Sequence, residues 1–461
     1  MIIKLNNKEI EVTGKEPLIE IALKEGYDIP FLCYNKRAKH KPSCMICAVK
    51  NCSTGQFIPS CTTFPTDGME IETESEEIRQ VRALSLELLL SDHRADCEAP
   101  CKIACPGGLD IAMMNRLYDA GKESEALELL RDTLVIPATL CYICNAPCEK
   151  ICRKNDIDKT VAIREIKKDL VSKTNLENIL KPKNNGKKVA VIGFNPAGFS
   201  TAYHLCKLGY ETTLFEQTDQ IILSYTEDSN VPPEIINLEL EVLKKMGVQF
   251  VISNENFILE DFDGIISTIS ENLNPEWIVL NTKSKQPARL VLEGKKLAEQ
   301  VHVKLSNLKN VKTENIKPFN SSYSRFTKTE KELIGEQHKI DNRKSNCLYC
   351  DCQRKNDCKL RIYATEYGIK NIRYLKESSF NALQKQHIKE DTWFEEAKCI
   401  RCGLCVYNSD NGFTFKDRGY MMKVILSEKN NSNINEELTR LCPTGALYIK
   451  KFQVQGSRFK D

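Results

Sequence analysis

The sequence predicts a multidomain chain that combines α+β and α/β parts. At 461 residues it exceeds the size at which one hydrophobic core keeps growing, so roughly three or more domains are expected. Its cysteines gather in separate groups, and a single β-α-β pattern with a glycine-containing turn lies between them. These observations divide the chain into five expected segments: residues 1–75, 76–175, 187–310, 345–375 and 376–461.

Composition narrows the classes of function. With 66 basic and 63 acidic residues the net charge is only +3, so neither nucleic acid nor an anionic surface is indicated as a partner. No apolar run approaches the ~18 residues of a membrane span, and no secretory leader opens the chain. We therefore expect a soluble, cytoplasmic protein, in which 21 cysteines favour metal or redox chemistry over disulfides.

The first segment predicts a small β-rich domain with a hairpin at Asn6-Asn7 and a helix ended by Gly26. Its four clustered cysteines have the spacing C-x10-C-x2-C-x13-C, which suits a [2Fe–2S] centre wrapped by backbone. They are Cys33, Cys44, Cys47 and Cys61. The segment resembles the [2Fe–2S] domain that opens the large iron–sulfur subunit of complex I and related hydrogenase and formate dehydrogenase subunits. That resemblance implies a β-grasp ferredoxin fold.

The second segment contains the largest number of cysteines. A helix is expected over residues 76–91, and two short amphipathic helices separate two cysteine loops. The seven cysteines of these loops are Cys97, Cys101, Cys105, Cys141, Cys144, Cys148 and Cys152. Thiolates that converge from two loops suit metal centres with four ligands each.

This second segment resembles the N-terminal helical domain of the glutamate synthase small subunit and of dihydropyrimidine dehydrogenase. The Cys105-Pro106 pair and the C-N-A-P-C-E run from Cys144 to Glu149 carry the likeness. It implies two [4Fe–4S] centres held by Cys97, Cys101, Cys105, Cys144, Cys148 and Cys152. Two such centres need eight ligands, and His93, Cys141 and Glu165 remain open as the odd ligands.

The third segment carries a dinucleotide fingerprint. An apolar strand ends at Gly193, the turn runs to Gly198 at the start of a helix, and a second strand ends at Glu216. The P-A-G of the turn makes it resemble the FAD domain of glutamate synthase small subunits. Asn195 replaces the second glycine, and the segment has room for one Rossmann unit, so the NADPH-binding half is expected to be missing. A truncated Rossmann-like FAD domain and a scaffold without flavin both remain open.

The last two segments each hold a group of cysteines. Cys347, Cys350, Cys352 and Cys358 can enclose one centre, either iron–sulfur or a structural zinc. This group resembles the cluster loop that follows the [2Fe–2S] domain in complex I-type subunits. Cys399, Cys402, Cys405 and Cys442 form one complete ligand set of a bacterial-ferredoxin-like domain and predict a single [4Fe–4S] centre.

The chain shows no recognisable nucleophile or acid–base motif, so we expect no catalytic residues in it. The leading hypothesis is an electron-transfer subunit in a hetero-oligomer. It would link a nicotinamide- or ferredoxin-reacting partner to a formate dehydrogenase- or hydrogenase-like partner. The alternative is a self-contained FAD/iron–sulfur oxidoreductase akin to the glutamate synthase small subunit. A scaffold protein that holds only zinc is the third class.

Overall fold

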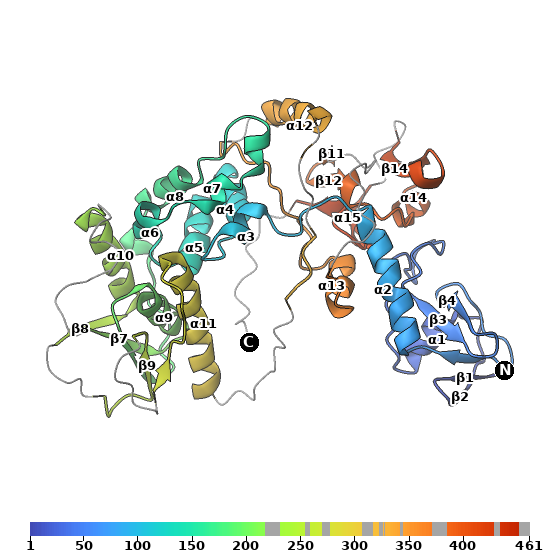
Figure 1. Ribbon diagram of the computed structural model, residues 1–461, viewed down its shortest axis with the longest axis horizontal. Helices are drawn as coiled ribbons and strands as arrows, with labels where there is room; N and C mark the ends of the chain where they lie inside the picture. The colour runs from blue at the N-terminus through green and yellow to red at the C-terminus, as the bar shows by residue number, and fades with distance from the viewer. Residues whose placement is uncertain are drawn as a thin grey trace. The chain divides into compact units, whose positions relative to one another are not determined.

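A computed structural model describes residues 1–216, 231–253, 259–269, 277–306, 317–321, 326, 328–341, 344–370, 385–427 and 434–450 (Figure 1). The chain forms two compact units. Unit 1 comprises Met1–Glu98, Asn315–Gln337 and Cys350–Lys451, and unit 2 comprises Ala99–Glu314, His338–Tyr349 and Phe452–Asp461. In sequence, unit 2 is therefore inserted into unit 1, and the expected 345–375 segment is divided between them.

Unit 1 begins with a mixed five-stranded sheet of order β2-β1-β5-β3-β4. Its elements are β1 (Ile2–Leu5), β2 (Lys8–Glu11), α1 (Leu18–Lys24), β3 (Ala48–Asn51), β4 (Gln56–Pro59) and β5 (Glu70–Glu72). Asn6 and Asn7 both have positive φ, as a tight two-residue hairpin requires. The predicted hairpin is therefore present, and the side chains of Ile3 and Leu5 point into the core beneath it.

Helix α2 (Glu76–Ser91) connects this sheet to the rest of unit 1, and its bounds are those expected from the sequence. Ser75 caps its N-terminus by accepting a hydrogen bond from the backbone N–H of Ile78. The fully buried guanidinium of Arg82 donates to the carbonyl oxygens of Ala48 and Thr73 at 2.9 Å. These bonds hold the helix against the first domain.

The remainder of unit 1 is built from short elements. They are α13 (Lys359–Glu366), β11 (Lys385–Lys389), β12 (Thr392–Glu395), α14 (Leu404–Asn408), β13 (Phe413–Lys416), β14 (Lys423–Leu426), α15 (Glu436–Leu441) and β15 (Leu447–Ile449). Strands β11, β12 and β15 form an antiparallel sheet, and β13 and β14 form a hairpin. Helix α12 (Lys328–Asp341) runs across the sequence boundary between the two units.

Unit 2 combines a helical part with a parallel sheet (Figure 1). The helices are α3 (Pro100–Ala104), α4 (Ile111–Asp119), α5 (Glu123–Leu134), α6 (Pro137–Ile143), α7 (Pro147–Lys150) and α8 (Ile163–Ser172). The sheet part contains β6 (Lys188–Ile192), α9 (Pro196–Lys207), β7 (Glu211–Glu216), α10 (Pro233–Met246), β8 (Gln249–Ile252), β9 (Gly264–Ser267), β10 (Ile278–Val279) and α11 (Pro287–Leu305). One hydrophobic core joins Leu130 of the helical part to Leu205 and Leu243.

All neighbouring strands of the unit 2 sheet are parallel, in the order β10-β9-β6-β7-β8. Helices α9 and α11 pack closely because Gly294 has no side chain at their contact. A Cβ at this position would lie 2.3 Å from the carbonyl oxygen of Ala197. This close contact places α11 against the helix that starts at the fingerprint turn.

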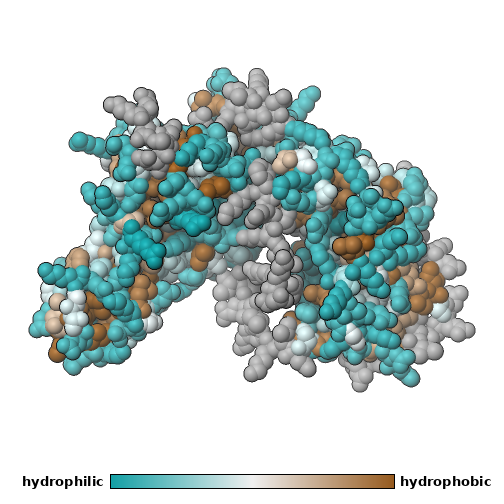
Figure 2. Space-filling view, turned by 180° about the vertical axis from the view of Figure 1, so that it is seen from behind, coloured by the Kyte–Doolittle hydropathy of each residue, from teal (hydrophilic) through white to brown (hydrophobic). Residues whose placement is uncertain are grey.

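The face of the molecule in Figure 2 is largely hydrophilic, with hydrophobic side chains in scattered patches. This agrees with a composition in which 28% of the residues are charged. Among the described helices, none has the length and apolar character that crossing a bilayer requires.

A buried carboxylate holds the helical part of unit 2 to the sheet part. Glu239 of α10 accepts hydrogen bonds from the backbone N–H of Ala138 at 2.6 Å and of Thr139, and from the Thr139 hydroxyl. These donors lie at the N-terminus of α6, which has no side-chain cap of its own. Burial outweighs these bonds and raises the pKa of Glu239 from 4.5 to about 7.

We predict that Glu239→Gln removes a pH dependence from the stability of α6. Between about pH 4.5 and 7 the folded state holds a proton that the unfolded chain has released. The wild-type free energy of local unfolding should therefore fall by roughly 3 kcal/mol as pH rises through this window. This free energy is measured at each pH by hydrogen exchange of the amides in α6, after correction for the pH dependence of the intrinsic exchange rates. Glu241→Gln on the exposed side of α10 is the control, and equal slopes in wild type and Glu239→Gln would refute the account.

Candidate iron–sulfur sites

The four cysteines of the first domain lie together in one buried loop region. Their exposed fractions are all 4% or less. The Cys33 thiol contacts those of Cys44 and Cys61, and the Cys47 thiol contacts that of Cys61. The backbone N–H of Ser43 also donates to the Cys33 sulfur at 3.4 Å. Hydrogen bonds of this kind favour the thiolate, the form that binds iron.

The C-terminal group of cysteines is also brought together. Cys399 and Cys402 precede α14, Cys405 lies in its first turn, and Cys442 follows α15. The sulfur of Cys442 is close enough to those of Cys399 and Cys402 to raise the pKa of both, after the larger effect of burial. The N–H of Arg401, a residue with positive φ, donates to the Cys399 sulfur at 3.3 Å. The structure thus gathers the four residues of the predicted [4Fe–4S] set.

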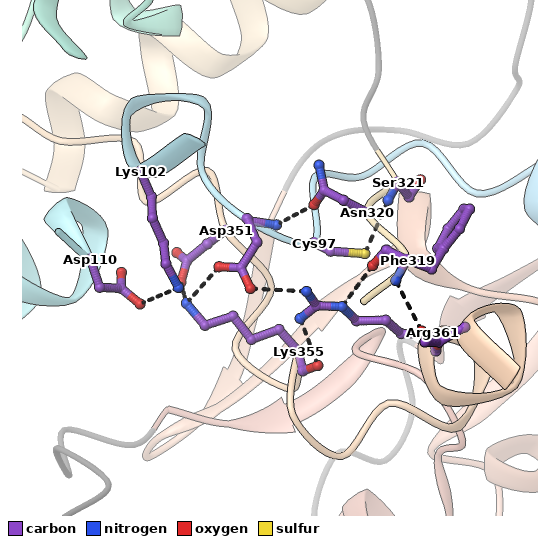
Figure 3. A network of polar contacts seen from close by, with 11 residues as sticks. Cys97, Lys102, Asp110, Phe319, Asn320, Ser321, Asp351, Lys355 and Arg361 are labelled. Carbon is purple, nitrogen blue, oxygen red and sulfur yellow. Dashed lines mark hydrogen bonds and ion pairs between the residues drawn. The ribbon is translucent and has the colours of Figure 1, made fainter. Parts of the chain in front are cut away.

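A third group in unit 1 joins Cys97 to cysteines more than 250 positions later in the chain. The N–H of Cys352 donates to the carbonyl oxygen of Cys97 at 3.1 Å. The N–H of Ser321 donates to the Cys97 sulfur at 3.3 Å, as Figure 3 shows. Cys358 is buried, and the sulfurs of Cys352 and Cys97 add to the effect of burial in raising its pKa to about 12. These three thiols therefore share one buried region.

A charged network surrounds this third group. Arg361 donates to the carbonyl oxygen of Phe319 at 2.8 Å and forms an ion pair with Glu98 at 3.0 Å. Figure 3 shows Arg361 beside Phe319 and the Asp351–Lys355 pair, whose charged atoms are 3.2 Å apart. The network anchors the segments on both sides of Cys97 and Cys352.

His93 has the properties of a fourth ligand for this group. Its ring is 6% exposed, and the Nδ1 atom has no hydrogen-bond partner in the described part of the chain. Burial, followed by the charge of Lys398, lowers the pKa of His93 to about 4, so the imidazole is neutral at pH 7. A neutral imidazole nitrogen without a partner is what a metal ligand needs. The donor set of one histidine and three cysteines therefore fits a [4Fe–4S] centre.

The sulfur of Cys352 lies against a glycine and a buried cation. A Cβ on Gly445 would come within 2.2 Å of that sulfur and within 3.6 Å of the Lys398 side chain. Lys398 is 2% exposed and pairs with Glu395 at 2.8 Å. Burial alone would lower the pKa of Lys398, but Cys352 and Glu395 outweigh burial and raise it. A positive charge is thus held close to the Cys352 sulfur.

The three thiol groups of unit 1 meet in a single hydrophobic core. This core contains Cys33 and Cys44 of the first group and Cys358 of the third, and Cys402 of the C-terminal group packs against it. Leu86 and Leu90 of α2 fill the space among them. Cofactors bound at the three groups would therefore be near neighbours.

All cysteines of the second segment except Cys97 lie in unit 2. Helices α3 and α7, which carry Cys101 and Cys148, pack against each other. The Cys148 thiol lies near those of Cys105 and Cys144, which add to the effect of burial in raising its pKa to about 11. Cys101, Cys105 and Cys152 are half-buried and pack against the core of the unit.

The candidate odd ligands are placed as follows. Cys141 is buried in α6 with its sulfur 4.0 Å from the carbonyl oxygen of Arg164. The side chain of Glu165 is 66% exposed and pairs with Lys168. His93 belongs to unit 1, whereas the sequence offered it as a ligand of the helical domain. Cys347 belongs to unit 2, whereas Cys350, Cys352 and Cys358 belong to unit 1. All 21 cysteines are described, and none forms a disulfide.

In the described ranges, no three His, Cys, Asp or Glu side chains lie close enough to hold a single metal ion. The ligands of an iron–sulfur centre lie farther apart, because iron and sulfide atoms stand between them.

The fingerprint turn of unit 2 has its expected backbone. Gly193 has φ +113°, and a Cβ on Gly198 would lie 1.9 Å from the Gly193 carbonyl oxygen. However, the Asn195 side chain accepts a hydrogen bond from the N–H of Gly198 at 3.0 Å, and Glu216 accepts one from Phe194 at 2.8 Å. A dinucleotide phosphate would bind at this helix terminus only after displacing the Asn195 carboxamide.

Two residues at these sites, Lys398 and Asn115, are not predicted from the sequence. Lys398 directly precedes Cys399 but reads as an ordinary surface lysine until its burial is known. Asn115 lies on the buried face of α4 and hydrogen-bonds the Cys347 thiol. No motif marks either position, because both contacts arise from distant segments.

Two parts of the chain match known domain families. Residues 1–76 match a "2Fe-2S iron-sulfur cluster binding domain". Residues 89–179 match "Dihydropyrimidine dehydrogenase domain II, 4Fe-4S cluster". These matches show a mixed α/β multidomain chain with a 2Fe-2S and a 4Fe-4S domain, as expected from the first two cysteine groups.

Curated relatives are similar over about a third of the chain. The NADPH-Fe(3+) oxidoreductase subunit beta of Geobacter sulfurreducens is 28% identical over 33% of this chain and 24% of its own length. The NADP(+)-dependent formate dehydrogenase subunit beta of Moorella thermoacetica is 29% identical over 32% and 25%. The glutamate synthase [NADPH] small chain of Bacillus subtilis is 30% identical over 37% and 40%. The matched region thus spans less than half of each relative.

Among solved structures, an NAD+-reducing [NiFe]-hydrogenase in the H2-reduced state aligns with all of this chain and 90% of its own. The identity is 11% and the TM-score is 0.38.

We predict that Asn195→Gly strengthens FAD binding by roughly fivefold, because it frees one N–H donor, worth about 1 kcal/mol, at the helix terminus. Quenching of flavin fluorescence on titration with the protein measures the dissociation constant. Asn175→Gly removes a similar cap, at the N–H of Glu177, and serves as the control. Unchanged or weaker FAD binding by Asn195→Gly would show that the carboxamide does not compete with the phosphate.

Proposed function

We propose that this chain is an iron–sulfur electron-transfer subunit. It carries electrons between a nicotinamide- or ferredoxin-reacting partner and a catalytic partner of formate dehydrogenase or hydrogenase type. The observation that carries the proposal is the single core of unit 1, into which thiols of three separate cysteine groups are packed. Bound iron–sulfur centres supply one-electron transfer, and their common core keeps successive centres close together.

The proposal assigns ligands as follows. The first domain binds a [2Fe–2S] centre through Cys33, Cys44, Cys47 and Cys61. Two [4Fe–4S] centres of unit 1 are bound by Cys399, Cys402, Cys405 and Cys442, and by His93, Cys97, Cys352 and Cys358. The helical domain of unit 2 binds further [4Fe–4S] centres through Cys101, Cys105, Cys144, Cys148 and Cys152. This changes the expected partners of Cys97, because its neighbours in the structure are Cys352 and Cys358.

The chain's own groups prepare these positions. Backbone N–H groups donate to the sulfurs of Cys33, Cys97 and Cys399 and so stabilise thiolates. The charge of Lys398 offsets the negative charge of the Cys352 thiolate in a region that excludes water. A nearby buried cation of this kind favours the reduced state of a centre, so it raises the reduction potential.

A reducing compartment suits the protein, since its cysteines form no disulfides. We place it in the cytoplasm as part of a hetero-oligomer. The named partner complexes belong to relatives that match only a third of this chain, so the identity of the partner is part of the proposal.

The second candidate is a self-contained FAD/iron–sulfur oxidoreductase like the glutamate synthase small subunit. The parallel sheet with Gly193, Gly198 and Glu216 at the end of its first strands supports this alternative. Against it stands the length of the segment, which accommodates one nucleotide-binding unit and leaves no room for a second, NADPH-binding unit.

We predict that the anaerobically purified chain accepts electrons from dithionite but does not oxidise NADPH by itself. Bleaching of the visible iron–sulfur absorption under each reductant measures this. The control is the same assay with a catalytic amount of an NADPH-oxidising flavoprotein, which should transmit electrons to the centres. Substantial NADPH oxidation by the isolated chain would instead support the self-contained flavoenzyme.

We further predict that His93→Cys keeps a full set of iron and lowers the potential of one [4Fe–4S] centre. The reason is that imidazole raises the potential of a centre relative to thiolate. A shift of ~59 mV, tenfold in the one-electron equilibrium, is the expected order.

The shift is measured by EPR-monitored redox titration. His93→Ala should lose that centre, whereas His387→Ala, on the exposed side of β11, should leave all centres unchanged. An unaltered EPR spectrum in both His93 variants would exclude the histidine as a ligand.

A further inference from the structure

The segment of residues 344–349 belongs to unit 2, although it is more than 200 positions away in sequence from the helix that it contacts. The backbone N–H of Ser345 donates to Asp119 at 2.6 Å, and the Ser345 and Tyr349 hydroxyls donate to the same carboxylate. Lys344 forms an ion pair with Glu123 at 2.9 Å. The segment is therefore clamped to the end of α4 and the start of α5.

This clamp directs Cys347 into the core of the helical part. Cys347 is 7% exposed and belongs to the same core as Cys148, and Cys152 packs against that core. Asn115 of α4 hydrogen-bonds the Cys347 thiol, and its own Oδ1 atom is buried without a partner among the described residues. Burial raises the pKa of Cys347, and the nearby sulfur of Cys152 adds to the effect.

The backbone around Cys347 repeats the geometry of a predicted cluster-binding turn. Tyr349 has φ +52°, and its N–H donates to the Cys347 sulfur at 3.4 Å. Two residues after Cys399, Arg401 has φ +57°, and its N–H donates to the Cys399 sulfur at 3.3 Å. Both stretches read C-x2-C in the sequence. The turn at Cys347 therefore presents its sulfur in the same way as the turn at Cys399.

The ligand count of unit 2 leaves a place for this sulfur. Cys148 has Cys105 and Cys144 as its thiol neighbours, whereas Cys152 has Cys347. Cys97, which the sequence assigned to the helical domain, lies with Cys352 in unit 1 instead. A centre that includes Cys152 has thus lost one expected ligand.

We propose that Cys347 is an iron–sulfur ligand of the helical domain and shares a [4Fe–4S] centre with Cys152. The inference rests on the proposed function, because it needs the cysteines to hold iron. The four cysteines from Cys347 to Cys358 then do not enclose one centre. Three of them contribute to two centres, with Cys347 serving unit 2 and Cys352 and Cys358 serving unit 1.

The test compares Cys347→Ala with Cys152→Ala and Cys352→Ala in the full chain, purified anaerobically. EPR spectra during stepwise reduction, with iron and sulfide content, are the readouts. We expect Cys347→Ala and Cys152→Ala to lose the same EPR signal, and the double variant to lose no second one. Cys352→Ala should lose a different signal, and the exposed Cys52→Ala should lose none.

Cys347→Ser distinguishes the loss of a ligand from a folding defect, because a serine oxygen can replace sulfur on iron. It should shift the signal that Cys347→Ala removes and leave the others in place. The proposal is overturned if Cys347→Ala removes the signal that Cys352→Ala removes, or if it leaves every signal intact. A folded wild-type chain without iron would overturn both this assignment and the proposed function. A wild-type chain that holds iron, with an unexpected result for Cys347→Ala, would overturn the assignment of Cys347 alone.

Discussion

The architecture depends on the backbone pairing between Cys97 and Cys352. The N–H of Cys352 donates to the carbonyl oxygen of Cys97, the N–H of Cys97 donates to the carbonyl oxygen of Ser321, and the N–H of Ser321 donates to the Cys97 sulfur. Nearly all of unit 2 is inserted in the sequence between these residues. A buried thiol group assembled from both sides of the insertion forms only if unit 1 closes around it, so the folding of unit 1 and the assembly of this group are coupled.

The charge of several thiolates buried close together then decides which cofactor a cysteine group of unit 1 can bind. Several thiolates in one hydrophobic core would repel each other, and burial raises the pKa of Cys358 and Cys399 to about 12 in the absence of a cofactor. Iron supplies the positive charge that keeps such thiolates ionised. The Lys398–Glu395 pair and the neutral ring of His93 lie beside the group of Cys97, Cys352 and Cys358. The local charge of that group therefore differs from the local charge of the other cysteine groups.

Local patterns were sufficient to predict much of the fold and part of the sites. The hairpin at Asn6-Asn7, helix 76–91 and the strand before Gly193 are present, because each depends on neighbouring residues. That the cysteines of the first group and of the last group lie together also follows from spacing, since each group lies within one domain. The partners of Cys97 and Cys347 could not be predicted this way. Spacing grouped each with its sequence neighbours, whereas long-range contacts through Ser321 and Asp119 set their positions.

The most direct measurement is the iron, acid-labile sulfide and zinc content of folded, anaerobically prepared protein. One [2Fe–2S] and four [4Fe–4S] centres require about eighteen irons per chain with a matching amount of sulfide and little zinc. Folded material that is colourless, or that carries zinc without sulfide, would contradict the account that these cysteines bind an electron relay.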